Sequence, residues 1–316
     1  MDLSLFFAGT SGSLPTQRRG LPAVVVRRGG DRILFDCGEG TQRQLLRSIG
    51  LLDLTEVFIT HFHADHWLGL PGLLKTFDLR GREAPLAIHG PSGLEDLLAV
   101  VMPAAGRVGY EIDRIELEPG EQLQRHGYRI ASVPVSHRGA AYGYVVCEDE
   151  RPGVFDPDRA TELGVSPGPD FGRLQRGETV GGISPDQVMG PARPGRKLTI
   201  SGDTRPCEAL KAAAHGSDVL VHESTFAIED AERAFQTGHA TASQAAGIAR
   251  DAGVTMLALT HFSTRYPVSV LRDEAREIFP NTVAPRDFDT IEIPFAEKGR
   301  PQLIRWAADV AAPQPG

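Results

Sequence analysis

Three histidines and an aspartate lie close together in the stretch THFHADHWLG, directly after an apolar run. His61 and His63 are two residues apart, so an extended backbone points both side chains to the same side. Asp65 and His66 follow in the turn before a helical pattern. Imidazole and carboxylate groups are ligands of zinc and similar divalent metals. The stretch predicts a metal site, and the alternative is a polar loop whose histidines are solvated.

Further candidate ligands follow apolar, strand-like runs elsewhere in the chain. His137 ends ASVPVSH, Asp203 ends LTISGD, and His261 ends MLALTH. Each could instead be an ordinary cap or turn residue, but layered α/β folds place their ligands at strand ends. With the first cluster they make seven ligands, enough for two metals if Asp203 bridges them. Such a pair can generate hydroxide and hold both the attacking and the leaving oxygen of a displacement.

The elements that would position these residues form two halves. Short β-branched and aromatic runs alternate with turns in the first half, and a helical pattern follows at 67–77. A second βαβ-like half has helical patterns near 206–215, 240–252 and 268–279. Between the halves, residues 150–197 are dense in Pro and Gly, so this segment is either functional or disordered. We expect one layered α/β domain over 1–316, with an inserted arm at about 150–195.

Composition narrows the class of protein. The 316 residues are 41% hydrophobic, which is ample for a packed core, and no apolar run approaches the ~20 residues of a membrane span. The net charge of −8 counts against broad attraction to nucleic acid, and no DNA partner is expected. The N-terminal stretch lacks the pattern of a signal peptide. Three scattered cysteines indicate reduced thiols, so we expect a cytoplasmic protein, with Cys37 as a small buried residue.

The order of the motifs resembles a known family. HxHxDH, a lone His, a GD and a final TH are the pattern of the metallo-β-lactamase fold, an αββα sandwich with a dinuclear site at the sheet edge. The ribonuclease Z branch, endonucleases that remove the 3′ trailer of precursor tRNA, is more similar still. The stretches that carry this resemblance, from about residue 5 to about 270, are GTSGSLPTQRRGLPAVVV, LFDCGEGTQRQLLR, THFHADHWLGLPGLL, SGDTRP, VHESTF, GHATASQAA and LTHFSTRY.

The resemblance implies a role for each matching residue. One zinc would be held by His61, His63 and His137, and the other by Asp65, His66 and His261, with Asp203 bridging; manganese would also suit these ligands. Asp65 would in addition accept the proton of the attacking water. His239 and Glu223 match positions proposed to form an acid–base pair, and a general acid suits a leaving 3′-oxygen. The alternative for His239 is a residue that orients its helix.

The resemblance also assigns the inserted segment. LGVSPGPDFGRLQRGETV at 163–180 looks like the Gly-Pro arm that grips the tRNA elbow. Residues 150–197 hold seven acidic and seven basic side chains, so the arm departs from a strongly basic clamp. Affinity for RNA would come from placed residues, and the alternative for the segment is a disordered spacer. The candidates for RNA contact are Arg173, Arg176, Arg193, Arg196, Lys197, Arg18, Arg19 and Arg265, the last three of which have equally ordinary structural explanations.

Three hypotheses remain for the activity. The first is a zinc-dependent endoribonuclease that cuts precursor tRNA after the discriminator nucleotide by attack of metal-activated hydroxide, leaving a 3′-hydroxyl. The second is a dinuclear hydrolase of small phosphodiesters, sulfate esters or thioesters. The third is an RNA-binding module or a di-iron, oxygen-reducing protein of the same fold. The resemblance favours the first and implies a homodimer in which the arm of one subunit serves the site of the other.

Overall fold

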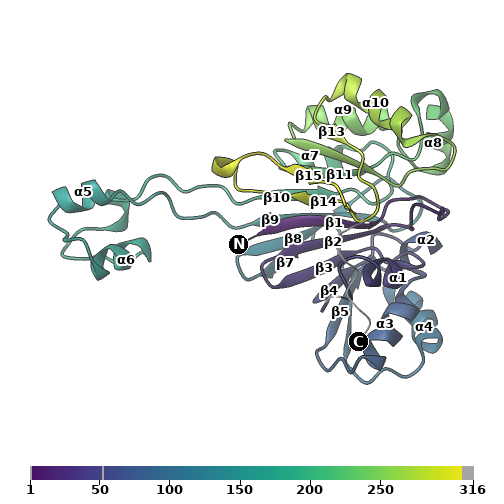
Figure 1. Ribbon diagram of the computed structural model, residues 1–316, viewed down its shortest axis with the longest axis horizontal. Helices are drawn as coiled ribbons and strands as arrows, with labels where there is room; N and C mark the ends of the chain where they lie inside the picture. The colour runs from purple at the N-terminus through teal and green to yellow at the C-terminus, as the bar shows by residue number, and fades with distance from the viewer. Residues whose placement is uncertain (1, 52, 308–316) are drawn as a thin grey trace.

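Two mixed β-sheets stack face to face, with helices on their outer sides (Figure 1). A computed structural model describes residues 2–51 and 53–307. The first sheet has the strand order β15-β14-β1-β2-β3-β4-β5-β6, and the second β13-β12-β11-β10-β9-β8-β7. The strands are β1 (Leu3–Gly9), β2 (Ala23–Arg28), β3 (Asp31–Phe35), β4 (Glu56–Phe58), β5 (Leu86–Gly90), β6 (Ile112–Glu116), β7 (Gln122–Arg125), β8 (Tyr128–Pro134), β9 (Tyr142–Glu148), β10 (Lys197–Ile200), β11 (Val219–Glu223), β12 (Met256–Thr260), β13 (Thr282–Val283), β14 (Thr290–Glu292) and β15 (Gln302–Ile304).

Alternation along the strands explains the layers. In β1, Leu5 and Phe7 belong to the core between the two sheets, whereas Phe6 and Ala8 belong to the core beneath the helices of the first sheet. Successive side chains of a strand point to opposite faces, so a strand that is apolar at every position must be covered on both sides. The predicted αββα sandwich, and with it the α/β class, is confirmed.

The helices cover these outer faces. α1, α3 and α4 pack on the first sheet and α7, α9 and α10 on the second. The pattern predicted at 67–77 is divided between α2 and α3, because Gly69 packs its backbone against Cys37 and Gly38. The helices are α1 (Thr41–Leu46), α2 (Ala64–Trp67), α3 (Leu70–Leu79), α4 (Leu94–Ala105), α5 (Pro157–Glu162), α6 (Pro169–Gln175), α7 (Glu208–Ala214), α8 (Ala231–Thr237), α9 (Ala242–Asp251) and α10 (Val268–Ile278), with 3-10 turns η1 (Pro185–Gln187), η2 (Ile228–Asp230) and η3 (Ala296–Lys298).

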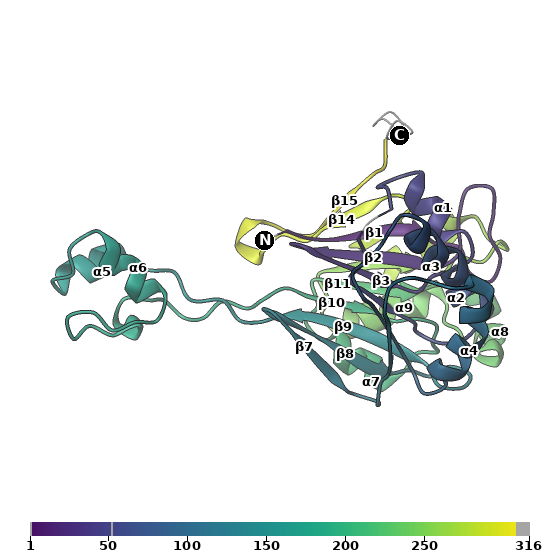
Figure 2. The same cartoon turned by 90° about the horizontal axis from the view of Figure 1, so that it is seen from below.

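The segment between β9 and β10 projects far from the sandwich and ends in α5 and α6 (Figures 1 and 2). Two extended stretches lead to the tip, and the bridges Arg151–Arg193 and Phe155–Met189 join them. The tip is not a structureless spacer, because it buries a small core of its own. That core consists of Ala160, Val165, Leu174, Val180 and Val188, with Phe155, Leu163, Phe171 and Ile183 packed against it.

The strand ends of the second sheet place the predicted ligands together. β10, β11 and β12 are parallel neighbours, so their carboxyl ends meet at one edge. Asp203 follows β10 and His261 follows β12 at this edge. The loop after β4 of the first sheet arrives at the same edge, next to α2. Within residues 2–51 and 53–307, no helix has both the length and the apolar composition needed to cross a membrane.

Candidate metal centre

The loop after β4 carries four of the predicted ligands into the site. His63 has extended backbone angles and immediately precedes α2, on which Asp65 and His66 lie. The side chains of His61 and His66 are buried, and their rings lie 4.1 Å apart. The backbone N–H of Thr60 donates to Asp36 Oδ1 at 2.8 Å, which fixes the start of this loop against the end of β3. A strand end that feeds a short helix therefore aims its polar side chains at one point.

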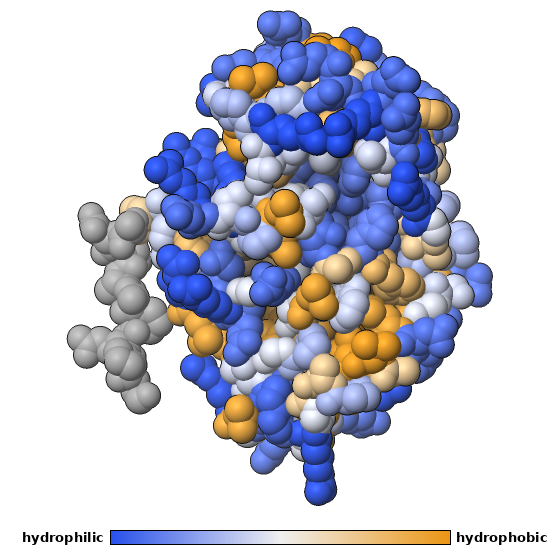
Figure 3. All heavy atoms as spheres, turned by 90° about the vertical axis from the view of Figure 1, so that its right-hand side faces the viewer, coloured by the Kyte–Doolittle hydropathy of each residue, from blue (hydrophilic) through white to orange (hydrophobic). Residues whose placement is uncertain are grey.

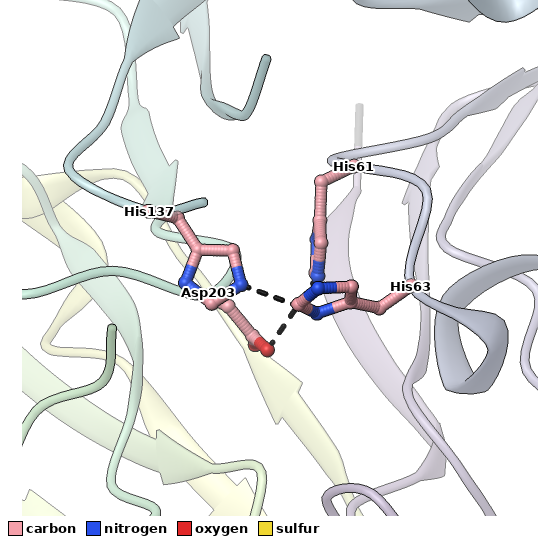
Figure 4. A group of neighbouring side chains, drawn as sticks. All are labelled: His61, His63, His137 and Asp203. Carbon is pink, nitrogen blue, oxygen red and sulfur yellow. Dashed lines mark hydrogen bonds and ion pairs between the residues drawn. The ribbon is translucent and has the colours of Figure 1, made fainter. Parts of the chain in front are cut away.

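One group of ligand atoms comes from both sheets. The side chains of His61, His63, His137 and Asp203 each offer an atom within 4.8 Å of the others (Figure 4). His137 Nε2 lies 3.2 Å from His63 Nδ1, and Asp203 Oδ2 lies 3.7 Å from His61 Nε2. Three imidazoles and one carboxylate are a common ligand set for zinc and related ions.

A second group lies beside the first. Asp65, His66 and His261 also bring their ligand atoms within 4.8 Å of one another. Asp203 Oδ2 lies 3.4 Å from His66 Nε2 and 3.3 Å from His261 Nε2, as well as 3.7 Å from His61 Nε2. This one carboxylate oxygen thus contacts ligands of both groups. The structure brings all seven predicted side chains together in two adjacent groups, with Asp203 between them.

Hydrogen bonds at the far side of the ring orient two of the imidazoles. His137 Nδ1 lies 2.7 Å from the carbonyl oxygen of Gly238, and His261 Nδ1 lies 2.8 Å from Thr225 Oγ1. Because a carbonyl oxygen can only accept, Nδ1 of His137 carries the proton and Nε2 keeps its lone pair for the site. Outer hydrogen bonds of this kind orient metal-binding histidines in proteins.

The donor atoms fit a metal because some have no hydrogen-bond partner among the described residues. Nε2 of His61 and Nε2 of His66 are buried and make no hydrogen bond within the described chain. Burial holds the pKa of His61 well below its ordinary value, so this ring is a neutral donor. Burial alone would raise the pKa of Asp203, but the neighbouring imidazoles of His261 and His66 hold it well below the usual range. Burial would lower the pKa of His66 as well, but the carboxylates of Asp203 and Asp36 raise it well above its ordinary value. A divalent cation requires neutral imidazoles and ionised carboxylates, so it would displace a proton from His66 on binding.

Glu223 and His239 form a pair at the edge of this cluster. His239 Nδ1 lies 2.9 Å from Glu223 Oε1, and the His239 ring stacks on His261 with centroids 5.4 Å apart. Burial alone would lower the pKa of His239, but the charge of Glu223 raises it to about 9. His239 Nδ1 also lies 3.7 Å from Asp203, so it could be considered a ligand. The shorter contact with Glu223 already occupies that nitrogen, which favours a role in proton transfer.

Three residues that the sequence did not point to support the predicted ligands. Asp36 Oδ2 lies 2.7 Å from His66 Nδ1, across 30 residues of chain, and Asp36 adopts a left-handed φ of 57°. The backbone N–H of Ser13 donates to Asp65 Oδ2 at 2.8 Å. A Cβ at Gly12 would lie 2.4 Å from His261 Nδ1, so only glycine fits there. Two sequence features could have pointed to these residues: the Gly-rich run after β1 and the Asp-Cys-Gly turn after β3. Both favour unusual backbone conformations, which often accompany functional sites.

The remaining candidate residues are either exposed to solvent or held within the protein. Cys37 is fully buried, as predicted, and burial raises the pKa of its thiol. Arg265 and Arg18 are exposed, whereas Arg19 donates to the carbonyl oxygen of Pro285 at 2.9 Å. The prediction of RNA contact was wrong for Arg196, which is 3% exposed and donates to Glu148 at 2.7 Å. His222 is buried with Nδ1 2.7 Å from the carbonyl oxygen of Glu223.

Asp36 gives a prediction that does not involve a ligand. Its carboxylate accepts from His66 Nδ1, from Thr60 Oγ1 at 2.9 Å and from the Thr60 N–H, and an asparagine has too few acceptor sites for all three. We expect Asp36→Asn to weaken metal binding by about 10–100-fold, as loss of an outer carboxylate does elsewhere. Titration with zinc in competition with a chelating dye measures this. Exposed Asp113→Asn is the matched control, and equal affinity of the two variants would contradict the role of Asp36.

Figure 3 shows the side of the molecule that carries α2 and α8, the side of the metal centre. Hydrophilic side chains predominate in the middle and upper parts of this face, and hydrophobic side chains gather lower down. A polar surface around the site suits a charged substrate better than it suits an apolar substrate.

The fold and the site define the class of protein. The family model of the metallo-beta-lactamase superfamily matches residues 19–261. Among solved structures, the YhfI protein of Bacillus subtilis, a metallo-beta-lactamase fold protein, superposes with a TM-score of 0.69 at 18% identity, covering 93% of this chain and 100% of that one. A likeness at this identity supports the fold alone. The fold, the family model and the His/Asp clusters together assign the chain to the metal-binding proteins of this superfamily.

Closer relatives narrow the assignment. The chain is 43% identical over 302 residues to ribonuclease Z of Methanosarcina acetivorans, covering 93% of this chain and 99% of that protein. It is 46% identical over 308 residues to ribonuclease Z of Gemmatimonas aurantiaca, covering 94% and 98%. The human tRNase Z, short form, superposes with a TM-score of 0.69 at 27% identity, covering 92% and 99%. The chain belongs to the ribonuclease Z family, and the resemblance seen in its motifs is confirmed.

Proposed function

We propose that this chain is a metal-dependent endoribonuclease that removes the 3′ trailer from precursor tRNA after the discriminator nucleotide and leaves a 3′-hydroxyl. The observation that carries the proposal is the complete, convergent set of seven ligand side chains in a chain similar to ribonuclease Z proteins along nearly its whole length. The solved human tRNase Z, at 27% identity, supports tRNA as the substrate.

Two divalent ions, zinc or manganese, would occupy the centre. His61, His63 and His137 would hold one ion, and Asp65, His66 and His261 the other, with Asp203 shared. Such ions lower the pKa of water and stabilise the charge that develops on a phosphodiester. Elemental analysis of the purified protein that finds fewer than two equivalents of metal would contradict the stoichiometry.

The chain's own groups would manage the protons. Asp65 Oδ2 is held by the Ser13 N–H and lies 3.3 Å from His261 Nε2, so its position is fixed at the site. It would accept the proton of the attacking water. His239, paired with Glu223, would donate a proton to the leaving 3′-oxygen, since an alkoxide is a poor leaving group unless it is protonated. Glu223 is itself held by Thr204 and Thr225, which fixes the imidazole through it.

The arm would bind the body of the tRNA, and it supports a homodimer. The tip helices α5 and α6 lie at one end of the molecule, and α2, beside the metal centre, lies at the other (Figure 1). An arm pointing away from its own site is suited to a tRNA that is cut by a second subunit. Arg173 and Arg176 are exposed on the tip, where they pair with Glu178. They remain the candidates for RNA contact there.

Deleting residues 155–190 tests the substrate. We expect the parent protein to cut precursor tRNA after the discriminator nucleotide. The deletion should lower kcat/KM on this RNA by about 100-fold or more, because a second binding contact is lost. Turnover of bis(p-nitrophenyl) phosphate should be retained. If the metal-loaded parent protein makes no cut near the discriminator nucleotide, the proposed function is wrong. An equal loss of activity on both substrates would mean that the deletion damages the sandwich.

Mixing two variants that each cut precursor tRNA poorly or not at all tests the dimer. The deletion variant has a site but no arm, and Asp65→Ala has an arm but no proton acceptor. If arms act between subunits, mixed dimers combine one intact arm with one intact site, so cleavage of precursor tRNA should return after subunit exchange. Light scattering gives the mass, and a monomer, or a mixture that stays inactive despite exchange, would contradict the arrangement.

A further inference from the structure

The root of the arm makes a set of contacts that neither the metal centre nor RNA binding accounts for. The connection between β14 and β15, which includes η3, lies on the side of the sandwich from which the arm leaves (Figures 1 and 2). It belongs to the first sheet, whereas the arm leaves the second sheet between β9 and β10. Phe295 and Glu297 of this connection contact both extended stretches of the arm.

Glu297 joins the two stretches electrostatically. Its carboxylate accepts from Arg151 at 2.8 and 3.1 Å and from Arg193 at 3.2 Å. Arg151 and Arg193 are also paired through their backbones, with N–H to carbonyl distances of 2.8 and 2.9 Å. A carboxylate between two guanidinium groups on opposite stretches holds them at a fixed separation, with the planar geometry that arginine favours.

Phe295 supplies the second half of the contact. The Cζ of Arg151 lies 3.5 Å from the centroid of the Phe295 ring, and the Cζ of Arg196 lies 4.0 Å from the same centroid. Cations above an aromatic face are attracted to it, most strongly where water is excluded. One aromatic ring therefore contacts the outgoing stretch through Arg151 and the returning stretch through Arg196.

Arg196 connects this contact to the interior of the sandwich. It donates to Glu148 at 2.7 and 2.8 Å and to the carbonyl oxygen of Ile293 at 2.9 Å. Glu148 also accepts from Arg28 of β2 at 2.8 Å, and all three charged side chains are at most 8% exposed. A buried ion pair of this kind is costly to disturb, because removal of one partner leaves an unpaired charge. The root is thus tied to both sheets.

We propose that Phe295 and Glu297 form a clamp that fixes the direction of the arm relative to the sandwich, and that this clamp positions the RNA held by the arm at the metal centre of the second subunit. The proposal rests on the proposed function, since it assigns the clamp to the same substrate. Two extended stretches joined by few bridges could swing about their root. A swinging arm would present the RNA in many orientations, so it would lower the effective concentration of the scissile bond at the site.

The kinetic test is Glu297→Gln, with Glu277→Gln on α10 as a control, because Glu277 is exposed and α10 packs on α9 and β13. We expect KM for precursor tRNA to rise by roughly fivefold to tenfold in Glu297→Gln, while kcat and the turnover of bis(p-nitrophenyl) phosphate stay unchanged. In a background lacking residues 155–190, Glu297→Gln should have no further effect. An equal loss on the small ester, or an effect in the armless background, would overturn the proposal.

A second measurement does not depend on the substrate. The backbone N–H groups of Arg151 and Arg193 bond across the root, so their hydrogen exchange reports how often the root opens. We expect Glu297→Gln and Phe295→Leu to speed exchange at these two amides severalfold and to leave the amides of the tip core unchanged. Unchanged exchange would overturn the clamp. If exchange is faster in the two variants but the parent protein does not cut precursor tRNA, the clamp is supported, and both the proposed function and the positioning role are overturned.

Discussion

Asp65→Ala should abolish hydrolysis of every substrate, large or small. Asp65 serves both as a ligand of the second group and as the proposed proton acceptor, and its Oδ2 has contacts with Ser13, His261 and His66. Removal of a positioned base alone costs up to about 10⁴-fold in rate, so we expect at least that loss in kcat. The loss should appear equally with precursor tRNA and with bis(p-nitrophenyl) phosphate, because both need an activated water.

Metal analysis separates the two roles of Asp65. The first group of ligands does not include this residue, so Asp65→Ala should keep about one equivalent of metal where the parent binds two. Asp65→Asn, which retains an oxygen for the Ser13 N–H, should bind more metal than the alanine variant and remain inactive. Exposed Asp113→Ala is the control. Parent-like turnover by Asp65→Ala would exclude both roles.

The ligands could be predicted because the sequence displays them locally. Four lie within six residues, and His137, Asp203 and His261 each follow a recognisable apolar run. Parallel strands then bring their carboxyl ends to one edge without any further information. The hydrogen-bond partners could not be predicted in this way. Ser13 and Asp65 are 52 residues apart, and only the tertiary structure brings them into contact.

The same limit explains the error at Arg196. A basic residue at the end of a Pro- and Gly-rich insertion suggests an exposed contact for RNA. Its partners Glu148 and Ile293 lie 48 and 97 residues away along the chain, so its burial depends on how the two sheets pack. Other basic residues of the segment are likewise paired within the protein. Arg151 and Arg193 pair with Glu297 rather than remaining free for a polyanion.

His239→Ala should separate substrates by their leaving groups. If His239 protonates the leaving 3′-oxygen, its loss should lower kcat on precursor tRNA by about 10²–10⁴-fold. p-Nitrophenolate is stable as an anion and needs no proton, so turnover of bis(p-nitrophenyl) phosphate should change far less. Glu223→Gln should show the same selectivity, because the carboxylate at 2.9 Å from His239 Nδ1 raises the pKa of that imidazole to about 9 and keeps it protonated.

The competing explanation is that His239 only orients its helix and the nearby ligands. Its ring packs against His137 and His261, with centroids 5.2 and 5.4 Å away, so a purely structural loss would disturb the metal centre itself. In that case both substrates would lose activity to the same extent, and metal content would fall. Exposed His215→Ala provides the matched control. Equal loss on RNA and small ester by His239→Ala would therefore reject the general acid, whereas a loss confined to RNA, with two metals retained, would support it.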